Sequence, residues 1–236
     1  MRKYRDQEGL YLVEGEKLVR EALSSGQNVT LIVAAETCGV PPGLSEEIVF
    51  MENRLFSKLA QTKTTQGILA VVEKRELTED EFLEKTDCKS GNVVLLDRLQ
   101  DPGNIGTIIR TADAAGYSGV MTIKGTADLY SSKIVRAAAG SLFRMPVFSA
   151  DSPAQAVSVL EAAGKTIFAT GFDTDLYYYD VDMKRKIGLI IGNEGNGISP
   201  ELMAMAHRII KIPMDGDIDS LNASVAAGIL MYESMR

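Results

Sequence analysis

Polar side chains that could orient a substrate gather where apolar, strand-like runs give way to helix-like ones. The first such junction is DPGNIGTIIRTADAAG (residues 101–116), in which Asn104 is predicted as the helix entry. Apolar residues follow it at spacings of 3, 4 and 7 and form one stripe. Arg110 lies about 140° from that stripe, at about 100° per residue. It is either a solvated helix residue or a cation presented to a ligand.

The second junction, LIIGNEGNGISPEL (residues 189–202), has three glycines between a strand-like and a helix-like run. Their order, G-x-x-G-x-G, differs from the G-x-G-x-x-G of a dinucleotide-binding turn, and the motif comes late in the chain. A nicotinamide oxidoreductase is therefore disfavoured. The glycines either serve tight turns alone or let the backbone approach a ligand closely, with Glu194 presented on the loop.

The third junction, IPMDGDIDSLNASVAAGIL (residues 212–230), places Ser220 before a helix-like run. Ser220 is predicted as the N-cap, and Asp217 and Asp219 suit the positive end of the helix dipole. Capping alone would explain Ser220 and Asn222, and a ligand-binding role is the alternative. The face of this helix that is predicted to be buried consists of Leu221, Val225, Gly228, Ile229 and Tyr232.

Other kinds of catalytic site find little support in the sequence. His207 is the sole histidine, so no Ser–His–Asp triad can be assembled, and its place in a strand-like run favours a structural role. Cys38 and Cys88 are isolated, which argues against a disulfide framework or a cysteine metal cluster. The carboxylates are scattered and no paired-histidine motif occurs, so no metal site is predicted.

An acidic stretch at residues 76–90 divides the chain. It lacks a continuous apolar pattern and is predicted to be a linker with one or two helical turns. Residues 1–75 contain strand-like runs around one amphipathic helix and form a small first domain. In residues 91–236, short apolar runs alternate with helical patterns. This alternation predicts an α/β domain with a mostly parallel sheet and helices on both faces.

The charge balance limits the classes of partner. A net charge of −7 argues against a protein that holds nucleic acid by bulk positive charge. Over half of the acidic excess lies in residues 76–90, which leaves room for a local basic surface elsewhere. No run approaches the roughly 20 apolar residues of a membrane span, and no signal-peptide stretch opens the chain. A cytoplasmic protein is predicted.

Three consecutive tyrosines, Tyr177, Tyr178 and Tyr179, form the one unusual tract. They either pack at a strand edge or in a loop, or they stack on the bases of single-stranded RNA.

Together and in register, NIGTIIRTADAAG, GNEGNGIS and IPM…SLNASVAAGI resemble the motifs of the SpoU (TrmH) family of RNA ribose methyltransferases, members of the knotted SPOUT superfamily. EGEKLVREAL and TKTTQGILAVV look like the small RNA-binding domain, related to ribosomal protein L30e, that many of these enzymes carry at the N-terminus. The likeness covers nearly the whole chain. Two departures are small, since Ala223 stands where valine is common and Asp219 where glutamate is often seen.

The resemblance implies that the C-terminal domain contains a deep trefoil knot and binds S-adenosylmethionine in a bent form. Carried over by position, Gly192, Ile212 and Leu221 should contact the cofactor, with Thr170 and Met214 as neighbours.

The resemblance also implies a catalytic set consisting of Asn104, Arg110, Glu194, Ser220 and Asn222. An arginine side chain has a pKa above about 12 and stays cationic. Arg110 is therefore expected to orient the ribose or a phosphate and to stabilise negative charge that develops on oxygen. Removal of the hydroxyl proton by Arg110 is a further hypothesis.

The expected partners are RNA and a second copy of the chain. Arg136 and Arg144, in SSKIVRAAAGSLFR, are candidate phosphate contacts or plain surface residues. The family is typically dimeric, with residues borrowed across the interface, so a homodimer is expected. An L30e-like domain favours ribosomal RNA as the substrate. A tRNA methyltransferase and a noncatalytic RNA-binding protein of the same fold are the alternatives.

Overall fold

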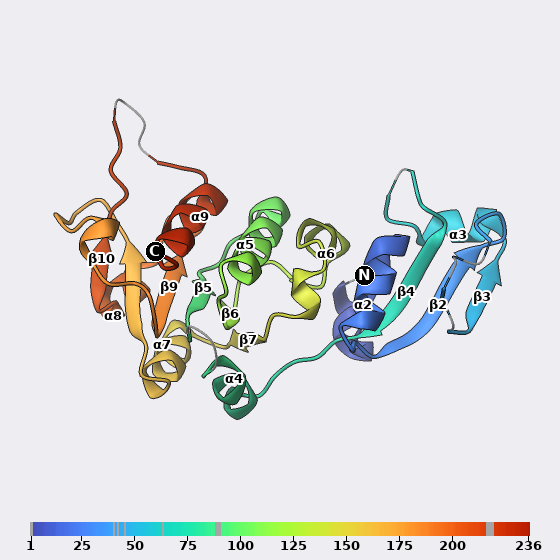
Figure 1. Cartoon of the computed structure of the whole chain (residues 1–236), viewed down its shortest axis with the longest axis horizontal. Helices are drawn as coiled ribbons and strands as arrows, with labels where there is room; N and C mark the ends of the chain where they lie inside the picture. Colours follow the sequence, from blue (N-terminus) through green and yellow to red (C-terminus); the bar gives the residue numbers. More distant parts are fainter. Residues whose placement is uncertain are drawn as a thin grey trace. The chain divides into compact units, whose positions relative to one another are not determined.

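A computed structural model describes residues 2–39, 41, 43–44, 46–62, 64–87, 91–215 and 220–236 (Figure 1). The chain forms two compact units, Met1–Arg75 with Asp128–Arg144, and Glu76–Ala127 with Met145–Arg236. Within the described ranges, no helix is long and apolar enough to cross a membrane.

The first unit is built on a four-stranded mixed sheet in the order β1-β4-β2-β3. Its N-terminal elements are α1 (Arg2–Glu8), β1 (Leu10–Glu14), α2 (Glu16–Ser24), β2 (Val29–Ala35), β3 (Ile48–Met51), α3 (Asn53–Leu59) and β4 (Ile68–Glu73). Strand β4 runs antiparallel to β1 and β2, and β3 is a parallel edge strand. Val33, Phe56 and Leu69 form part of its core. The strands predicted from the apolar runs are confirmed, whereas β3 and α3 lacked a clear pattern.

Residues 128–144 also belong to this unit, although sequence patterns grouped them with the C-terminal domain. They form α6 (Ser132–Ala137) and η1 (Ser141–Phe143). The Arg5 guanidinium donates to the Asp128 carboxylate at 2.6 and 3.0 Å, and the Gln27 amide donates to the Phe143 carbonyl at 2.8 Å. These contacts join residues more than 100 positions apart, which local patterning cannot reveal.

The second unit contains a parallel six-stranded sheet in the order β10-β8-β9-β5-β6-β7. Its elements are α4 (Glu79–Thr86), β5 (Val93–Leu96), α5 (Pro102–Ala114), β6 (Gly119–Ile123), β7 (Val147–Ala150), α7 (Pro153–Ala162), β8 (Thr166–Thr170), η2 (Tyr178–Asp180), β9 (Ile187–Ile191), α8 (Pro200–Met205), β10 (Arg208–Ile210) and α9 (Ala223–Glu233). The predicted parallel α/β architecture is confirmed.

Helices cover both faces of this sheet. α4, α7 and α8 share one hydrophobic cluster with β5, β6 and β9. α5 and α9 lie side by side on the opposite face (Figure 1). The α4 segment differs from the expected linker, because Phe82 is fully buried and its ring centroid lies 5.6 Å from that of Phe148. Thr78 and Glu81 form a capping box that starts the helix.

The predicted orientation of α9 is wrong. Ala227, Leu230 and Met231 are its buried residues, whereas Val225 and Tyr232 are about half exposed. This helix is apolar nearly all round, so its pattern does not select a face, and packing against α5 decides it. The predicted cap is wrong too, because Asn222 accepts hydrogen bonds from the N–H groups of residues 224 and 225. Asp217 and Asp219 lie outside the described residues.

The sole histidine is used within the fold. His207 directly precedes β10, and its Nδ1 accepts from the N–H of Ile167 at 3.1 Å. That bond leaves the proton on Nε2, which lies 3.1 Å from the Glu161 carboxylate. Of the two cysteines, Cys38 is partly buried and Cys88 lies outside the described residues.

Candidate active site

A cavity of about 620 Å³ opens beyond the carboxyl ends of β8, β9 and β10. The chain runs from β5 to β6 and β7 on one side of the sheet and returns to β8, β9 and β10 on the other, so its order reverses between β5 and β9. Open α/β sheets bind ligands at such switch points, and this cavity lies on the β9 side of that point. The residues predicted to contact a cofactor all line this cavity: Thr170, Gly192, Ile212, Met214 and Leu221.

Gly192 packs directly against the backbone of the glycine-rich loop, at the wall of the cavity. A Cβ atom at this position would lie 2.3 Å from the carbonyl carbon of Gly197 and 2.4 Å from the nitrogen of Ile198. The backbone of residues 193 and 197 is paired by two N–H···O bonds of 2.9 Å, which hold the loop closed against Gly192. Only glycine fits here, and the reason is space rather than a left-handed backbone.

Three of the predicted catalytic side chains form one hydrogen-bonded chain. The Asn222 amide donates to Asn104 Oδ1 at 2.9 Å, and the Asn104 amide donates to Glu194 Oε1 at 3.2 Å. Asn104 is buried, while Glu194 and Asn222 line the cavity. The amide orientation of Asn104 is fixed, because its nitrogen donates to Glu194 and its oxygen accepts from Asn222. Asn222 is fixed in the same way, since its nitrogen donates to Asn104 and its oxygen accepts from the N–H groups of residues 224 and 225.

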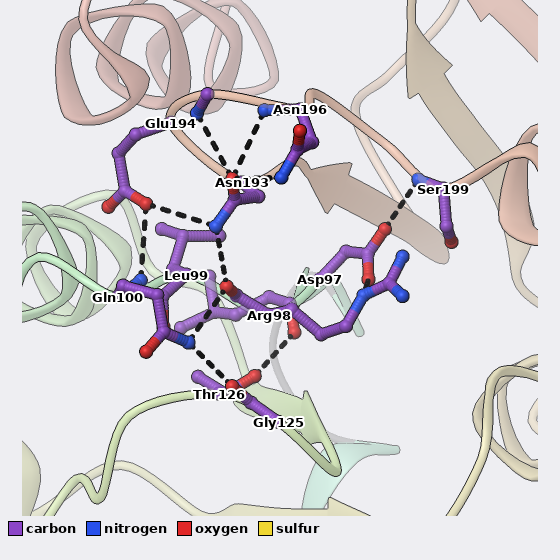
Figure 2. Close-up of polar contacts among 12 residues, drawn as sticks. Asp97, Arg98, Leu99, Gln100, Gly125, Thr126, Asn193, Glu194, Asn196 and Ser199 are labelled. Atoms are coloured by element: carbon purple, nitrogen blue, oxygen red, sulfur yellow. Dashed lines mark hydrogen bonds and ion pairs between the residues drawn. The ribbon is translucent and has the colours of Figure 1, made fainter.

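The carboxylate of Glu194 also binds the start of α5. It accepts from the backbone N–H of Gln100 at 3.1 Å (Figure 2), and from that of Asp101 at 3.0 Å. The predicted helix entry is corrected here, because α5 begins at Pro102 and Asp101 is its N-cap, accepting from the N–H of Asn104 at 2.8 Å. Loop and helix start are therefore joined through one side chain.

Burial raises the pKa of Glu194, but hydrogen bonds from its own backbone, from Gln100 and Asp101 and from the Asn104 amide lower it by more. The net pKa lies below the ordinary value of 4.5. The ionised form is thus the one that the folded loop prefers.

This lowered pKa predicts a pH dependence of folding. A carboxyl with a depressed folded pKa contributes stability above its unfolded pKa and loses it as the pH falls through the folded pKa. The Glu194→Gln variant should therefore unfold more easily than the unsubstituted protein at pH 6–8, and the difference should shrink below about pH 4.5. Thermal unfolding of both proteins from about pH 3 to pH 8 measures it. A difference that stays constant through the acid range would contradict this role of the charge.

Asp97 is a residue that sequence reasoning missed. It follows β5, is fully buried, and accepts at Oδ2 from the Ser199 N–H at 2.6 Å (Figure 2). Its Oδ1 accepts from Nε of Arg98 at 2.9 Å, and Arg98 adopts a left-handed backbone with φ of 55°. The position of Asp97 directly after the apolar run VVLL was the available signal.

Asn193 fastens the other end of the same loop. Its amide donates to the Arg98 carbonyl at 2.8 Å, and its Oδ1 accepts from the N–H groups of Gly195 at 3.0 Å and Asn196 at 3.1 Å (Figure 2). Together, Asp97 and Asn193 bind both ends of the glycine-rich loop to the segment that follows β5.

Two of the predicted catalytic residues, Ser220 and Arg110, take no part in this hydrogen-bonded chain. Ser220 lines the cavity, yet it neither caps α9 nor contributes a hydrogen bond to the chain. Arg110 is exposed and absent from the cavity wall. Six residues along α5 separate it from Asn104, which means about 9 Å along the axis and a different face of the helix.

The two candidate phosphate contacts lie in the first unit. Arg144 forms an ion pair with Glu21. Nη1 of Arg136 is shielded from solvent and has no hydrogen-bond partner within the described part of the chain. Arg144 is thus exposed but paired, and Arg136 is partly buried.

An open parallel sheet, with a glycine-walled cavity beyond β8, β9 and β10 and a fixed Asn–Asn–Glu chain, defines an α/β protein that binds a small ligand beside oriented polar groups. Residues 91–232 match the SpoU rRNA Methylase family, and residues 1–70 match the MRM3-like substrate binding domain. The chain belongs to the SpoU rRNA methylase family.

Individual relatives agree over nearly the full length. The 23S rRNA (guanosine(2553)-2'-O)-methyltransferase RlmP of Bacillus subtilis is 36% identical over 98% of this chain and 90% of its own. The SpoU methyltransferase AviRb from Streptomyces viridochromogenes has a TM-score of 0.88 at 30% identity, covering 100% of this chain and 92% of its own. The AdoMet-bound rRNA methyltransferase from Sinorhizobium meliloti has a TM-score of 0.87 at 31% identity, over 99% and 90%. The predicted family and the N-terminal substrate-binding domain are confirmed.

Proposed function

We propose that this protein transfers a methyl group from S-adenosylmethionine to a ribose 2′-hydroxyl of ribosomal RNA. The observation that carries the proposal is the hydrogen-bonded chain of Asn222, Asn104 and Glu194 beside the cavity at Gly192. The full-length likeness to a 23S rRNA 2'-O-methyltransferase supports ribosomal RNA. The cytoplasm is the proposed location, because ribosomal RNA is found there.

The cavity suits the cofactor in size and chemistry. Its volume falls in the range of small-molecule sites, and its wall combines apolar residues such as Ile212 and Leu221 with polar ones such as Asn193. Gly192, Ile212 and Leu221 would contact the cofactor, with Thr170 and Met214 beside it. Bound there, the cofactor supplies a methyl group on a positively charged sulfur, which an aligned oxygen can attack. The C-terminal segment is proposed to thread through a loop and form a deep trefoil knot.

The chain's own residues would align the ribose. Glu194 holds Asn104, and Asn104 in turn holds Asn222, so the polar rim of the cavity is fixed before substrate arrives. Such positioning removes much of the entropic cost of the reaction. Ser220, two residues before Asn222 on the same segment, would shape the ribose pocket.

Arg110 is proposed to act in the active site of a partner subunit. It is exposed and lies off the cavity of its own chain, so it does not reach that cavity as the chain stands. On the neighbouring helix α9, the half-exposed Val225 and Tyr232 lie seven residues apart on one face. An exposed apolar helix face of this kind favours a homodimer. In the dimer, the guanidinium would orient the ribose or adjacent phosphate and stabilise the developing alkoxide.

The first unit is proposed to hold the RNA. Its match to a substrate-binding domain supports this. Arg136 and Arg144 remain proposed phosphate contacts, although Arg144 would first have to exchange Glu21 for a phosphate.

Two measurements test the proposed function. Calorimetric titration with S-adenosylmethionine should give saturable binding at about one site per chain. Incubation with methyl-labelled cofactor and bacterial 23S rRNA, protein-free or in large subunits, should leave the label in a dinucleotide that resists alkaline hydrolysis, because a methylated 2′-oxygen cannot attack its phosphate. Label on a base would contradict the reaction. Absence of cofactor binding up to millimolar concentrations, with or without rRNA, would favour the noncatalytic RNA-binding alternative.

A further inference from the structure

The segment between β8 and β9 carries four aromatic side chains that methyl transfer does not use: Phe172, Tyr177, Tyr178 and Tyr179. Phe172 is 73% exposed and Tyr179 is 47% exposed. Single exposed aromatics are common, but several on one short segment form a surface that normally meets a ligand.

The tyrosine rings form an ordered group. Tyr177 and Tyr179 are stacked, with ring centroids 5.3 Å apart and planes at 7°. Tyr178 meets Tyr179 edge-on, with centroids 5.0 Å apart. Tyr178–Asp180 forms the 3-10 turn η2, which packs against α9. The ring of Tyr179 is therefore held by two neighbouring rings while nearly half of the residue stays exposed.

This group is attached to the wall of the candidate active site. The N–H of Lys211 donates to the Leu176 carbonyl at 2.9 Å, and the N–H of Tyr178 donates to the Lys211 carbonyl at 3.1 Å. The Lys211 ammonium lies 4.9 Å from the centroid of the Tyr177 ring. Lys211 and Phe172 both line the cavity. The tyrosine rings are therefore joined through Lys211 to the segment that lines the cavity.

The charges of the segment select the part of RNA that can bind. Residues 172–183 contain four aspartates, whereas Lys184, Arg185 and Lys186 follow directly and the Lys211 ammonium lies 3.6 Å from Asp175. The RNA backbone carries one negative charge per nucleotide, so the aspartates repel it and its phosphates can lie only over the flanking cations. A nucleobase is uncharged and can stack on any exposed aromatic ring. A stacked base, with its phosphates turned away, is the form of binding that satisfies both conditions.

We infer that Tyr179, held in place by Tyr177 and Tyr178, is a stacking platform for an unpaired base of the RNA substrate next to the methylated nucleotide. This inference rests on the proposed function, since it takes RNA as the substrate of the neighbouring cavity. Single-stranded segments are the usual targets of specific RNA recognition, because their bases are free to stack.

Substitutions at Tyr179 test the platform through turnover. Tyr179→Leu should lower kcat/KM for 23S rRNA by roughly 10- to 100-fold, the range expected for one lost stacked base. The affinity of Tyr179→Leu for S-adenosylmethionine should stay within twofold of that of the unsubstituted enzyme. The matched controls Tyr179→Phe and Tyr179→Trp keep an aromatic face, so their cofactor affinity should also stay within twofold and their kcat/KM within about threefold. If Tyr179→Leu methylates rRNA as fast as the unsubstituted enzyme, the platform is refuted.

A fluorescence test separates this inference from the proposed function. The chain contains no tryptophan, so Tyr179→Trp introduces a single reporter. Millimolar oligoadenylate of 12 nucleotides should quench its emission, whereas an abasic ribose-phosphate oligomer of equal length should not. This holds even if methyl transfer is never detected, in which case only the proposed function fails. The platform is overturned if both oligomers quench the emission equally or if neither quenches it. It is also overturned if the emission is blue-shifted and changes only on dilution, because that result means that a second subunit covers the ring.

Discussion

Replacement of Gly192 by alanine should nearly abolish binding of S-adenosylmethionine. The new Cβ would lie 2.3 Å from the Gly197 carbonyl carbon, whereas carbon atoms in contact normally stay about 3.5–4.0 Å apart. The loop must therefore move by roughly 1 Å, and it forms a wall of the cavity. We expect the dissociation constant to rise by about 100-fold or more, equivalent to about 2.7 kcal/mol. Calorimetry and equilibrium dialysis measure this directly.

The same loop offers a matched control. A Cβ at Gly195 would meet only Asn193 Oδ1 at 3.8 Å, an ordinary contact distance, and the backbone there is not left-handed. Gly195→Ala should therefore leave cofactor affinity within about threefold. Overpacking at Gly192 should also lower the free energy of unfolding by about 1–3 kcal/mol. If Gly192→Ala remains folded and binds the cofactor as tightly as Gly195→Ala, the proposed cofactor site is wrong.

Replacement of Arg110 by alanine should lower kcat by about 10²–10³-fold and leave cofactor affinity unchanged within twofold. Loss of one preorganised donor to a developing oxyanion commonly has an effect of this size. Lysine keeps the charge but not the planar fork, so Arg110→Lys should recover only part of the activity. Full turnover by Arg110→Lys would contradict both the orienting role and proton removal by the guanidinium.

A mixing experiment decides whether Arg110 acts across the dimer. Asn222→Ser is the suitable second variant, because serine still caps α9 but lacks the amide NH2 group that reaches Asn104. Each variant alone should be nearly inactive. After subunit exchange, half of the dimers are mixed, and each mixed dimer has one site with both native residues if Arg110 comes from the partner. Activity should then return to about a quarter of the native value. If Arg110 acts within its own chain, subunit exchange restores no methyltransferase activity.

The two kinds of variant separate binding from chemistry. Gly192→Ala should act on cofactor affinity, whereas Arg110→Ala should act on turnover at saturating cofactor. Loss of cofactor binding in Arg110→Ala would contradict the assignment of that residue to the chemical step rather than to cofactor binding.

The order of the elements was predictable from sequence because it depends on local periodicity. Strand-like runs such as VVLL and IGLII became β5 and β9, and the apolar stripe of residues 105–112 became the buried face of α5. Alternation of strands and helices then required a parallel sheet, and a parallel sheet places all strand ends at one edge. For that reason the sequence alone assigns the loops that carry Glu194 and Asn222 to one site.

Contacts between distant residues were not predictable in this way. The face of α9 that is buried depends on α5, because a helix that is apolar all round has no preferred side. The assignment of residues 128–144 to the first unit depends on Asp128 and Phe143 meeting partners more than 100 residues away. Such contacts leave no periodic signal in the chain.

The sequence by itself determined the fold class, the family and the residue types of the site, since each of these is written in short contiguous motifs. Only the tertiary structure decided how those motifs connect. It showed that Asn104 joins Glu194 to Asn222, that Asp97 fastens the loop at Ser199, and that the cavity wall excludes Arg110. The physical reason is that hydrogen bonds between loops depend on where whole strands and helices bring their ends, and that placement comes from packing of the entire core.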